Sequence, residues 1–194
     1  MEQIGKLIVI TGGTVSGKDT VVAELLKINP TWRKIVTTTT RPIRLNEQNG
    51  IDYNFVNLET FREIKANGKF LETVEYAGNN YGTFKSSFNP FFKGQTCIWR
   101  IDPSRAAKVN LLFDQSFNKA QTIKNNTVVI YLDIPDKKTV YQRLRARGIS
   151  EIEIEKRIQQ DEENRKDGHF EQVVINYNGR LNETLQKIMS LIKT

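Results

Sequence analysis

A glycine-rich run near the N-terminus matches the pattern G-x-x-x-x-G-K and consists of Gly12-Gly13-Thr14-Val15-Ser16-Gly17-Lys18. A continuously apolar stretch, residues 6–11, precedes it and is typical of a buried strand, and apolar residues at helical spacing over 18–28 follow it. This order binds phosphate because glycines let backbone N–H groups turn toward phosphate oxygens, and because the helix N-terminus adds partial positive charge. The run predicts an α/β protein that holds the phosphates of a nucleotide.

The residue after the motif lysine is unusual. Lys18 is expected to reach the β- and γ-phosphates of the nucleotide. The next position normally carries Ser or Thr to hold Mg²⁺, but here it is Asp19, followed by Thr20. A carboxylate beside a triphosphate is repelled unless a cation lies between them. Asp19 is therefore expected to bind Mg²⁺, to pair with a basic residue, or simply to begin the helix as a favourable N-terminal acid.

Strand and helix patterns alternate along the rest of the chain. We predict further strands at 35–40, 53–56, 70–76, 81–84, 96–101, 128–132 and 173–175. We predict helices at 58–67, 136–147, 151–167 and 179–193, the third of which begins with a capping box of Ser150 and Glu153. The alternation indicates a parallel core sheet, and the short strands between 36 and 85 suggest an inserted lobe.

Composition limits the chemistry and the partners. The 194 residues fit one domain, and 29 Lys and Arg against 22 Asp and Glu give a net charge of +7, which favours anionic partners. One Cys and one His exclude a disulfide within the chain and a zinc site built from several such residues. The first apolar run is too short for a signal peptide or a membrane span, and a lone Cys97 fits a reducing compartment, so we expect a cytoplasmic protein.

A basic loop follows the second predicted strand. Within residues 39–56, Arg41 and Arg44 lie three positions apart and Tyr53 follows. Arginine side chains bind phosphate bidentately and stay charged, so the two arginines and the tyrosine hydroxyl could clamp a phosphate dianion. The alternative from spacing alone is a solvated basic loop.

The loop and the glycine-rich run together resemble the guanylate kinase family. Its signature reads T-[ST]-R, a basic residue three later, an acid three after that, then Gly and Y-x-F, and residues 39–55 fill each of these positions. The resemblance continues through segments of the guanine site, the lid and the last core strand, at 70–72, 81–83, 143–148, 155–158 and 173–176. It therefore covers almost the whole chain.

This resemblance implies the reaction ATP + GMP ⇌ ADP + GDP, with dGMP as a further acceptor. The implied fold is a P-loop NTPase three-layer sandwich of class α/β, with a parallel core sheet, an inserted mixed-β GMP-binding lobe and a helical lid. The core would comprise about residues 1–36, 86–136 and 168–194, the lobe about 37–85 and the lid about 137–167. The implied partners are ATP with Mg²⁺ and GMP. Neither nucleic acid nor a membrane is expected, because the chain carries no RNP-like or helix-turn-helix signature and two nucleotide sites explain its charge.

The resemblance also assigns residues. Residues implied in phosphoryl transfer are Lys18, Arg41, Arg143, Arg147 and Arg157. Residues implied in ATP binding are Gly12, Gly13, Thr14, Val15, Ser16, Gly17, Lys18, Asp19, Thr20 and Asn176, with Asp19 as the candidate metal ligand. Residues implied in GMP binding are Thr37, Arg41, Arg44, Glu47, Tyr53, Glu72, Tyr81, Thr83 and Asp102. The alternative for the lid arginines is a solvated helix face, which we assign to Arg145.

The chemistry of Glu72 supports guanine. A carboxylate accepts two hydrogen bonds, from N1–H and the exocyclic amine of guanine, whereas adenine would leave a buried carboxylate unpaired. The alternative is that Glu72 is an exposed strand residue, and for Tyr53 and Tyr81 it is ordinary packing within the lobe.

Three features depart from the family pattern. Arg100 stands where the family usually has an acid, two residues before Asp102. We expect a swap, in which Asp19 supplies the missing carboxylate and pairs with Arg100. Residues 110–126 exceed the usual connection, and Phe113 and Phe117 there could bury a helix extension or form a subunit contact. Asn46 replaces a usual glycine, and because Asn tolerates positive φ the turn is expected to survive.

Two other functions compete with guanylate kinase activity. One is a related kinase with a different small phosphorylated acceptor, which Glu72 and the arginine pair disfavour. The other is a guanylate-kinase-like binding module without catalysis, which Lys18 and the lid arginines disfavour and Arg100 weakly favours. The oligomeric state stays open.

Overall fold

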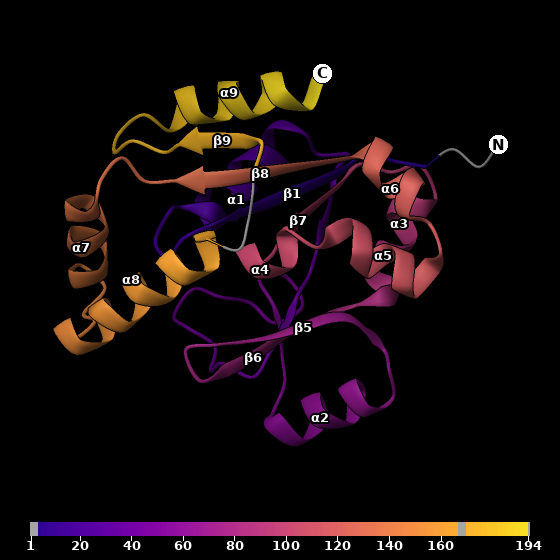
Figure 1. Ribbon diagram of the computed structural model, residues 1–194, viewed down its shortest axis with the longest axis horizontal. Coiled ribbons are helices and arrows are strands. Elements are labelled where there is room, and N and C mark those ends of the chain that lie inside the picture. The colour runs from indigo at the N-terminus through magenta and orange to yellow at the C-terminus, as the bar shows by residue number, and fades with distance from the viewer. Residues whose placement is uncertain (1–3, 167–169, 194) are drawn as a thin grey trace. The chain divides into compact units, whose positions relative to one another are not determined.

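The computed structural model describes residues 4–166 and 170–193 (Figure 1). Its strands are β1 (Leu7–Gly12), β2 (Arg33–Ile35), β3 (Thr38–Thr39), β4 (Asn54–Phe55), β5 (Phe70–Tyr76), β6 (Asn79–Phe84), β7 (Cys97–Arg100), β8 (Thr127–Asp133) and β9 (Gln172–Ile175). Its helices are α1 (Lys18–Ile28), α2 (Leu58–Ala66), α3 (Asn89–Phe92), α4 (Pro103–Ala106), α5 (Val109–Phe117), α6 (Ala120–Asn126), α7 (Lys137–Arg145), α8 (Glu151–Lys166) and α9 (Leu181–Lys193), with a 3₁₀ turn, η1, at Lys85–Phe88. The predicted lid end at 167 and core restart at 168 lie outside the described residues.

The described residues form a five-stranded sheet in the order β2-β7-β1-β8-β9. β2 pairs with β7 in parallel, with Ile35 opposite Trp99, and β8 pairs with β9 in parallel, with Leu132 opposite Val174. All of β1 is buried, which explains why its sequence is continuously apolar rather than alternating. The predicted α/β fold with a parallel core sheet is thereby confirmed.

A second, four-stranded sheet has the order β4-β3-β6-β5. It is mixed, because β3 pairs in parallel with β4 and antiparallel with β6, and β5 pairs antiparallel with β6. β5 and β6 form a hairpin around the positive-φ residues Ala77 and Gly78. Asn57 caps α2 through a hydrogen bond from the Thr60 N–H, and Gly68, at φ 61°, follows the end of that helix.

The predicted single strand at 35–40 is wrong. Its first part lies in β2 of the parallel sheet, whereas Thr38 and Thr39 form β3 of the mixed sheet. The chain changes sheets at residues 36–37, and β-branched residues on both sides hid the break.

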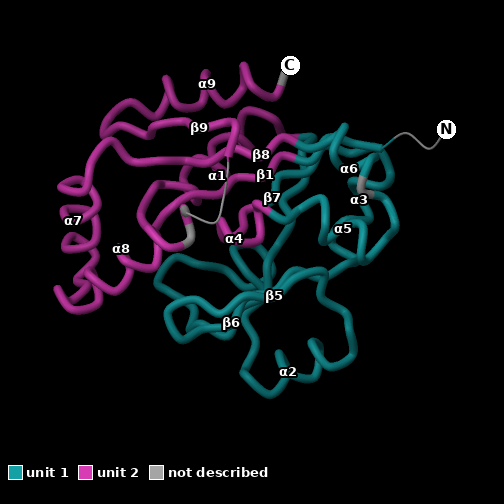
Figure 2. Tube along the Cα trace, viewed as in Figure 1, with its two compact units in different colours: residues 1–7, 31–99, 108–127 teal, residues 8–30, 100–107, 128–194 magenta. Residues whose placement is uncertain are grey.

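The chain divides into two compact units, each discontinuous in sequence (Figure 2). Unit 1 comprises residues 1–7, 31–99 and 108–127, and unit 2 comprises residues 8–30, 100–107 and 128–194. The core of unit 2 includes the fully buried Ile8, Val9 and Ile10 of β1, and there α9 packs against α1 and β9.

Aromatic residues form much of the core of unit 1, and the segment 110–126 contributes to it. This segment folds as most of α5 and α6, and Phe113 on α5 is fully buried. The Phe113 ring lies 4.8 Å from the centre of the Phe88 ring and 6.3 Å from that of Trp99. Phe117 is half-buried and lies 5.1 Å from Phe92. Phe113 therefore buries the helix extension against the core, which is the first of the two roles predicted for it.

Candidate active site

The glycine-rich run forms a loop between β1 and α1, and two glycines in it are structurally required. Gly12 has φ 142°, and a Cβ there would lie 2.1 Å from the Leu132 carbonyl oxygen. Gly17 has φ 91°, and a Cβ there would lie 2.5 Å from the Asn176 amide nitrogen. That amide donates to the Ser16 carbonyl at 2.8 Å, and the Thr184 hydroxyl donates to the Asn176 amide oxygen at 3.1 Å. Asn176, predicted at the ATP site, therefore supports the loop backbone directly.

Lys18 lies along the loop. Its ammonium donates to the carbonyls of Gly12 at 2.8 Å and Gly13 at 2.5 Å, and to the Ser16 hydroxyl at 3.3 Å. Burial and then the charge of Arg100 lower the Lys18 pKa to about 8, although three carboxylates oppose this shift, namely Asp19, Asp161 and Asp102. The ammonium therefore stays mostly protonated at neutral pH.

Helices α7 and α8 pack against the same loop through an apolar cluster. Val15 of the loop is buried with Leu144 of α7 and Ile154 of α8. Val15 has φ 49°, a conformation that β-branched residues rarely adopt, so packing must hold it there. Arg143 of α7 adds a hydrogen bond of 2.9 Å to the Val15 carbonyl. Its guanidinium also donates to the Asn178 side chain at 2.6 Å.

The carboxylate of Asp161, on α8, also contacts the loop. It accepts a hydrogen bond from the Thr14 N–H. A Cβ on Gly13 would lie 3.0 Å from the same Asp161 oxygen, so the carboxylate lies directly against the loop. Burial raises the Asp161 pKa to about 6. Sequence reasoning missed this residue, because a single acid in a helix rich in both charges carries no motif.

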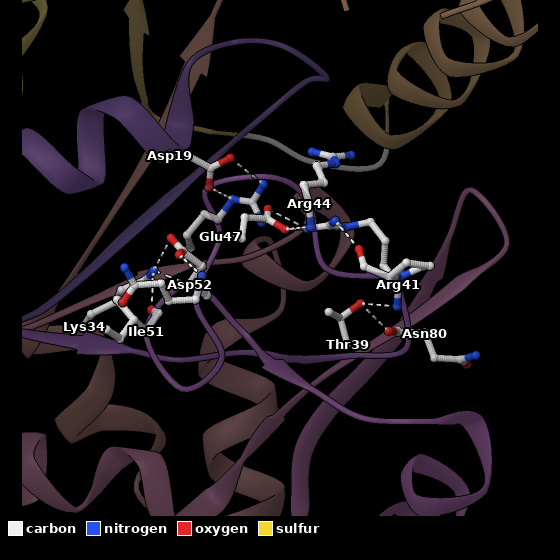
Figure 3. Close-up of polar contacts among 12 residues, drawn as sticks. Asp19, Lys34, Thr39, Arg41, Arg44, Glu47, Ile51, Asp52 and Asn80 are labelled. Atoms are coloured by element: carbon white, nitrogen blue, oxygen red, sulfur yellow. Dashed lines mark hydrogen bonds and ion pairs between the residues drawn. The ribbon is translucent and has the colours of Figure 1, made fainter.

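Asp19 forms an ion pair with Arg100, the last residue of β7. Arg100 Nε lies 3.0 Å from Asp19 Oδ1, and Nη2 lies 3.3 Å from Oδ2. Figure 3 shows the Asp19 carboxylate with both contacts as dashed lines. The predicted pairing of these two residues is confirmed. Asp102, two residues further on, caps α4 by accepting from the Ser104 N–H at 2.8 Å.

The remaining predicted lid residues lie on α7, on α8 and between them. Arg157 pairs with Glu153 at 2.7 Å and is mostly buried. Arg147 is exposed. Burial of Arg143 lowers the Arg143 pKa, and the positive charge of Arg147 lowers it further. Half of the predicted capping box forms, because Ser150 accepts from the Glu153 N–H at 3.4 Å while the Glu153 carboxylate bonds to Arg157 instead. Arg145 pairs with Glu151 on an exposed face, as expected for a residue outside the site.

In unit 1, Arg41 and Glu47 meet within the basic loop (Figure 3). Arg41 Nη2 donates to both oxygens of Glu47, at 2.7 and 3.0 Å, and the Arg44 N–H donates to one of them at 2.8 Å. Burial alone would raise the Glu47 pKa, but these hydrogen bonds outweigh burial and lower it. Asn46 has φ 72°, so the turn survives without glycine as predicted. Glu47 therefore orients Arg41, while the Arg44 side chain is exposed.

Aromatic rings and a hydroxyl complete the surroundings of Arg41. Its guanidinium lies over the Tyr53 ring at 5.5 Å, and the Tyr53 and Tyr81 rings lie 6.1 Å apart. The Arg41 N–H donates to the Thr39 hydroxyl at 3.1 Å, and that hydroxyl donates to the Asn80 carbonyl at 3.0 Å (Figure 3). The structure thus brings Arg41, Tyr53 and Tyr81 together.

A chain of buried polar groups surrounds Glu72 in the same unit. The Thr83 hydroxyl donates to Glu72 Oε1 at 2.7 Å and accepts from the Trp99 indole N–H at 3.2 Å. The hydroxyls of Thr37 and Thr83 lie 3.5 Å apart. Glu72 is only 6% exposed, so it is not a solvent-facing strand residue. Trp99 was not predicted in this group, because its apolar neighbours marked it only as core.

No dedicated metal centre is present in the described part of the chain, where no group of three or more His, Cys, Asp and Glu could hold a metal ion. The Asp19 carboxylate in the first turn of α1 is 71% exposed and offers the type of oxygen ligand that Mg²⁺ prefers. Among residues 4–166 and 170–193, no helix is both long and apolar enough to span a membrane.

The first strand of the parallel sheet, β1, runs into the glycine-rich loop, and α7 and α8 pack on that loop. This arrangement is typical of the class of phosphate-loop nucleotide-binding α/β proteins. Comparison with known proteins narrows the class. The guanylate kinase family model matches residues 4–194. The chain is 35% identical over 198 residues to a guanylate kinase of Prochlorococcus marinus (strain MIT 9312), covering 100% of both chains. It is 36% identical over 162 residues to that of Thermosynechococcus vestitus, covering 82% of this chain and 79% of the other.

The fold agrees with these relatives. The crystal structure of guanylate kinase from Anaplasma phagocytophilum superimposes with a TM-score of 0.66 at 24% identity, covering 100% of this chain and 87% of that one. The chain therefore belongs to the guanylate kinase family, and the resemblance inferred from its motifs is confirmed.

Proposed function

We infer that the protein is a guanylate kinase, which transfers the γ-phosphoryl group of ATP to GMP and releases ADP and GDP. Family membership supports the reaction. The observation that carries the choice of acceptor is the buried Glu72 carboxylate with its Thr83 partner. We place the protein in the cytoplasm, in purine nucleotide metabolism, with dGMP as a second acceptor.

The acceptor residues are assigned by their chemistry. Glu72 would accept hydrogen bonds from N1–H and the exocyclic amine of guanine, with Thr37, Thr83 and Asp102 as further guanosine contacts. The GMP phosphate would bind Arg41, Arg44, Tyr53 and Tyr81. Because Glu47 holds Arg41 through two hydrogen bonds, the clamp would be oriented before GMP arrives, which lowers the entropy cost of binding.

The donor residues are assigned in the same way. The ATP phosphates would bind the backbone N–H groups of residues 12–18 and the Lys18 ammonium, with Thr20 and Asn176 nearby. Mg²⁺, when bound with ATP, would neutralise part of the negative charge of the phosphates. Asp19 is the residue that could contribute a carboxylate ligand to it.

Transfer breaks the bond between the γ-phosphorus and the bridging oxygen of ATP and forms a bond to a phosphate oxygen of GMP. The protein contributes alignment and positive charge rather than covalent chemistry. We assign the charge to Lys18, Arg41, Arg143, Arg147 and Arg157. We further propose a core at 1–36, 86–136 and 168–194, a GMP lobe at 37–85 and a lid at 137–167, whose closure would exclude water.

A coupled assay of ADP release with ATP and Mg²⁺ tests this function, offering GMP, dGMP, AMP, UMP and CMP in parallel. Turnover with GMP far above AMP is expected. Turnover with a different acceptor would keep the kinase reaction but refute the role of Glu72. No turnover from a protein that still binds GMP would indicate a non-catalytic binding module.

A further inference from the structure

Three contacts hold the α7–α8 pair on the phosphate loop, all of them within unit 2. Val15 packs against Leu144 and Ile154, and Arg143 donates to the Val15 carbonyl. The third contact is polar and more unusual, because the Asp161 carboxylate accepts from the Thr14 N–H. The first two contacts involve no N–H group of the loop, whereas the third occupies one.

The Thr14 N–H belongs to the set that a phosphate-binding loop offers to a nucleotide. A carboxylate resembles a phosphate to such a donor, since both carry oxygen acceptors with negative charge. The Asp161 oxygen also lies 3.0 Å from where a Gly13 Cβ would be, so the carboxylate lies directly against the loop backbone. A nucleotide phosphate can use this donor only after the Asp161 carboxylate leaves it.

The charges around Asp161 favour a held but replaceable anion. Lys18 from α1 and Arg157 from α8 itself attract the carboxylate, and Asp102 at the start of α4 repels it. The pKa of Tyr131 on β8 is raised by burial and by nearby acids that include Asp133 and Asp161. Burial penalises the Asp161 carboxylate further. An incoming phosphate would gain the same Thr14 N–H and Lys18 contacts with more negative charge.

We propose that the Asp161 carboxylate is an internal anion of the phosphate loop, which competes with the phosphates of ATP and ADP for the Thr14 N–H and so sets the affinity of the nucleotide site. The idea rests on the proposed function, because it takes the loop as the nucleotide site. It adds a residue that lowers affinity, rather than one that binds substrate. Because Asp161 lies on α8, nucleotide binding would also release one of the three contacts that hold the α7–α8 pair on the loop.

Binding of ADP without metal, measured by isothermal titration calorimetry, tests the proposal directly. Asp161→Asn is expected to bind ADP about three- to tenfold more tightly than the unaltered protein, because the competing charge is gone. Glu163→Gln is the matched control, since Glu163 lies two residues away on the exposed face of α8. The substitution removes the same charge as Asp161→Asn but at a side chain that makes no contact with the loop. We expect its affinity for ADP to change less than about twofold.

A second readout separates competition from a general loss of negative charge. As pH falls through the Asp161 pKa of about 6, protonation should end the competition in the unaltered protein. The ratio of ADP affinities between Asp161→Asn and the unaltered protein should therefore shrink toward one. The ionisation of ADP itself cancels in this ratio, because both proteins bind the same ligand.

Two results would overturn the inference while leaving the proposed function intact. One is ADP binding to Asp161→Asn that is equal to, or weaker than, binding to the unaltered protein. The other is an affinity ratio that does not depend on pH. If neither protein bound ADP, the nucleotide site itself would be refuted and the inference with it. Asp161→Ala provides a second test if the asparagine variant does not fold.

Discussion

The guanidinium of Arg100 and the carboxylate of Asp19 face each other through two contacts, Nε to Oδ1 at 3.0 Å and Nη2 to Oδ2 at 3.3 Å. The two residues lie 81 positions apart and come from the end of β7 and the first turn of α1. The pair is partly exposed, with 27% of the Arg100 side chain and 71% of the Asp19 side chain accessible. Its contribution to stability is therefore small. The pair matters instead for the charge beside Lys18, because, in addition to the larger effect of burial, Arg100 lowers the Lys18 pKa and Asp19 raises it.

Reversing the charge of Arg100 alone should impair catalysis, and removing the charge of Asp19 as well should repair it. Arg100→Asp alone would place a second carboxylate beside Asp19 and the ATP phosphates, so we expect kcat/KM to fall at least about tenfold. Arg100→Asp combined with Asp19→Ser restores the family arrangement and should recover most of the loss. Steady-state kinetics with GMP measures both variants. A double variant no better than the worse single variant would refute the swap.

Replacing Glu72 should remove the preference for guanine. Glu72→Gln offers an amide in place of one carboxylate oxygen, and it would oppose the N1–H or amine of guanine with a donor of its own. We expect kcat/KM for GMP to fall about a hundredfold, with a much smaller change for AMP. Glu75→Gln, on the exposed part of the same strand, is the control. An unchanged ratio of GMP to AMP would contradict the assignment.

Removing the charge of Glu47 should weaken GMP binding more than turnover. Glu47→Gln loses one of the two hydrogen bonds between Arg41 and Glu47 and so holds the guanidinium less firmly. We expect the KM for GMP to rise about tenfold and kcat to change less than about threefold. Glu59→Gln in the first turn of α2 is a charge-matched control. Equal falls in kcat and kcat/KM would instead give Glu47 a role in the transition state.

The depressed pKa of Lys18 should limit nucleotide binding in alkaline solution. Below about pH 8 the ammonium is charged and can bind phosphate, and above that value it is increasingly neutral. Affinity for metal-free ADP should therefore fall as pH rises through about 8, approaching tenfold per pH unit at most. Lys18→Arg should show no such decline, because arginine stays protonated. Calorimetric titrations across this range make the comparison, and parallel declines in both proteins would exclude Lys18 as the cause.

Phe113 should be essential for the stability of unit 1. Its ring is fully buried among Phe88, Phe91 and Trp99, so Phe113→Ala should lower the free energy of unfolding by about 3–5 kcal/mol. Leu111, 52% exposed on the same helix, is the control, and Leu111→Ala should cost less than about 0.5 kcal/mol. Urea denaturation measures both. A small loss for Phe113→Ala would mean that the segment 110–126 does not support the core.

Helices and strands whose own residues carry a clear turn or a periodic apolar pattern were predicted from the sequence. The glycine-rich run and the periodic apolar residues after it predicted α1 at Lys18–Ile28, and the bounds of β5 were also correct. The helices between 103 and 126 were not predicted individually, although Asp102 followed by Pro103 is a typical helix start. The break between β2 and β3 could not be predicted, because the partners that separate the two strands lie far along the chain.

In the candidate site too, residues that depart from a known pattern were predicted, whereas contacts between residues far apart in the chain were not. Charge departures at Asp19 and Arg100 were enough to predict that the two residues pair. Asp161 was not predictable, since Thr14 lies 147 positions away and the surrounding helix is rich in charges of both signs. The hydrogen bond from the Trp99 indole N–H to the Thr83 hydroxyl was missed, because nothing in the apolar sequence around Trp99 indicates which residue its N–H would bind.

The dependence of the loop on Asn176 has a consequence for synthesis. A growing chain emerges from its N-terminus, so residues 12–18 leave the ribosome long before the amide that supports Ser16 and lies against Gly17. All residues of unit 1 are also synthesised before residue 128, and therefore before most of β8 and all of β9. A nascent or truncated chain that stops before residue 176 therefore lacks the amide that supports the loop backbone at Ser16.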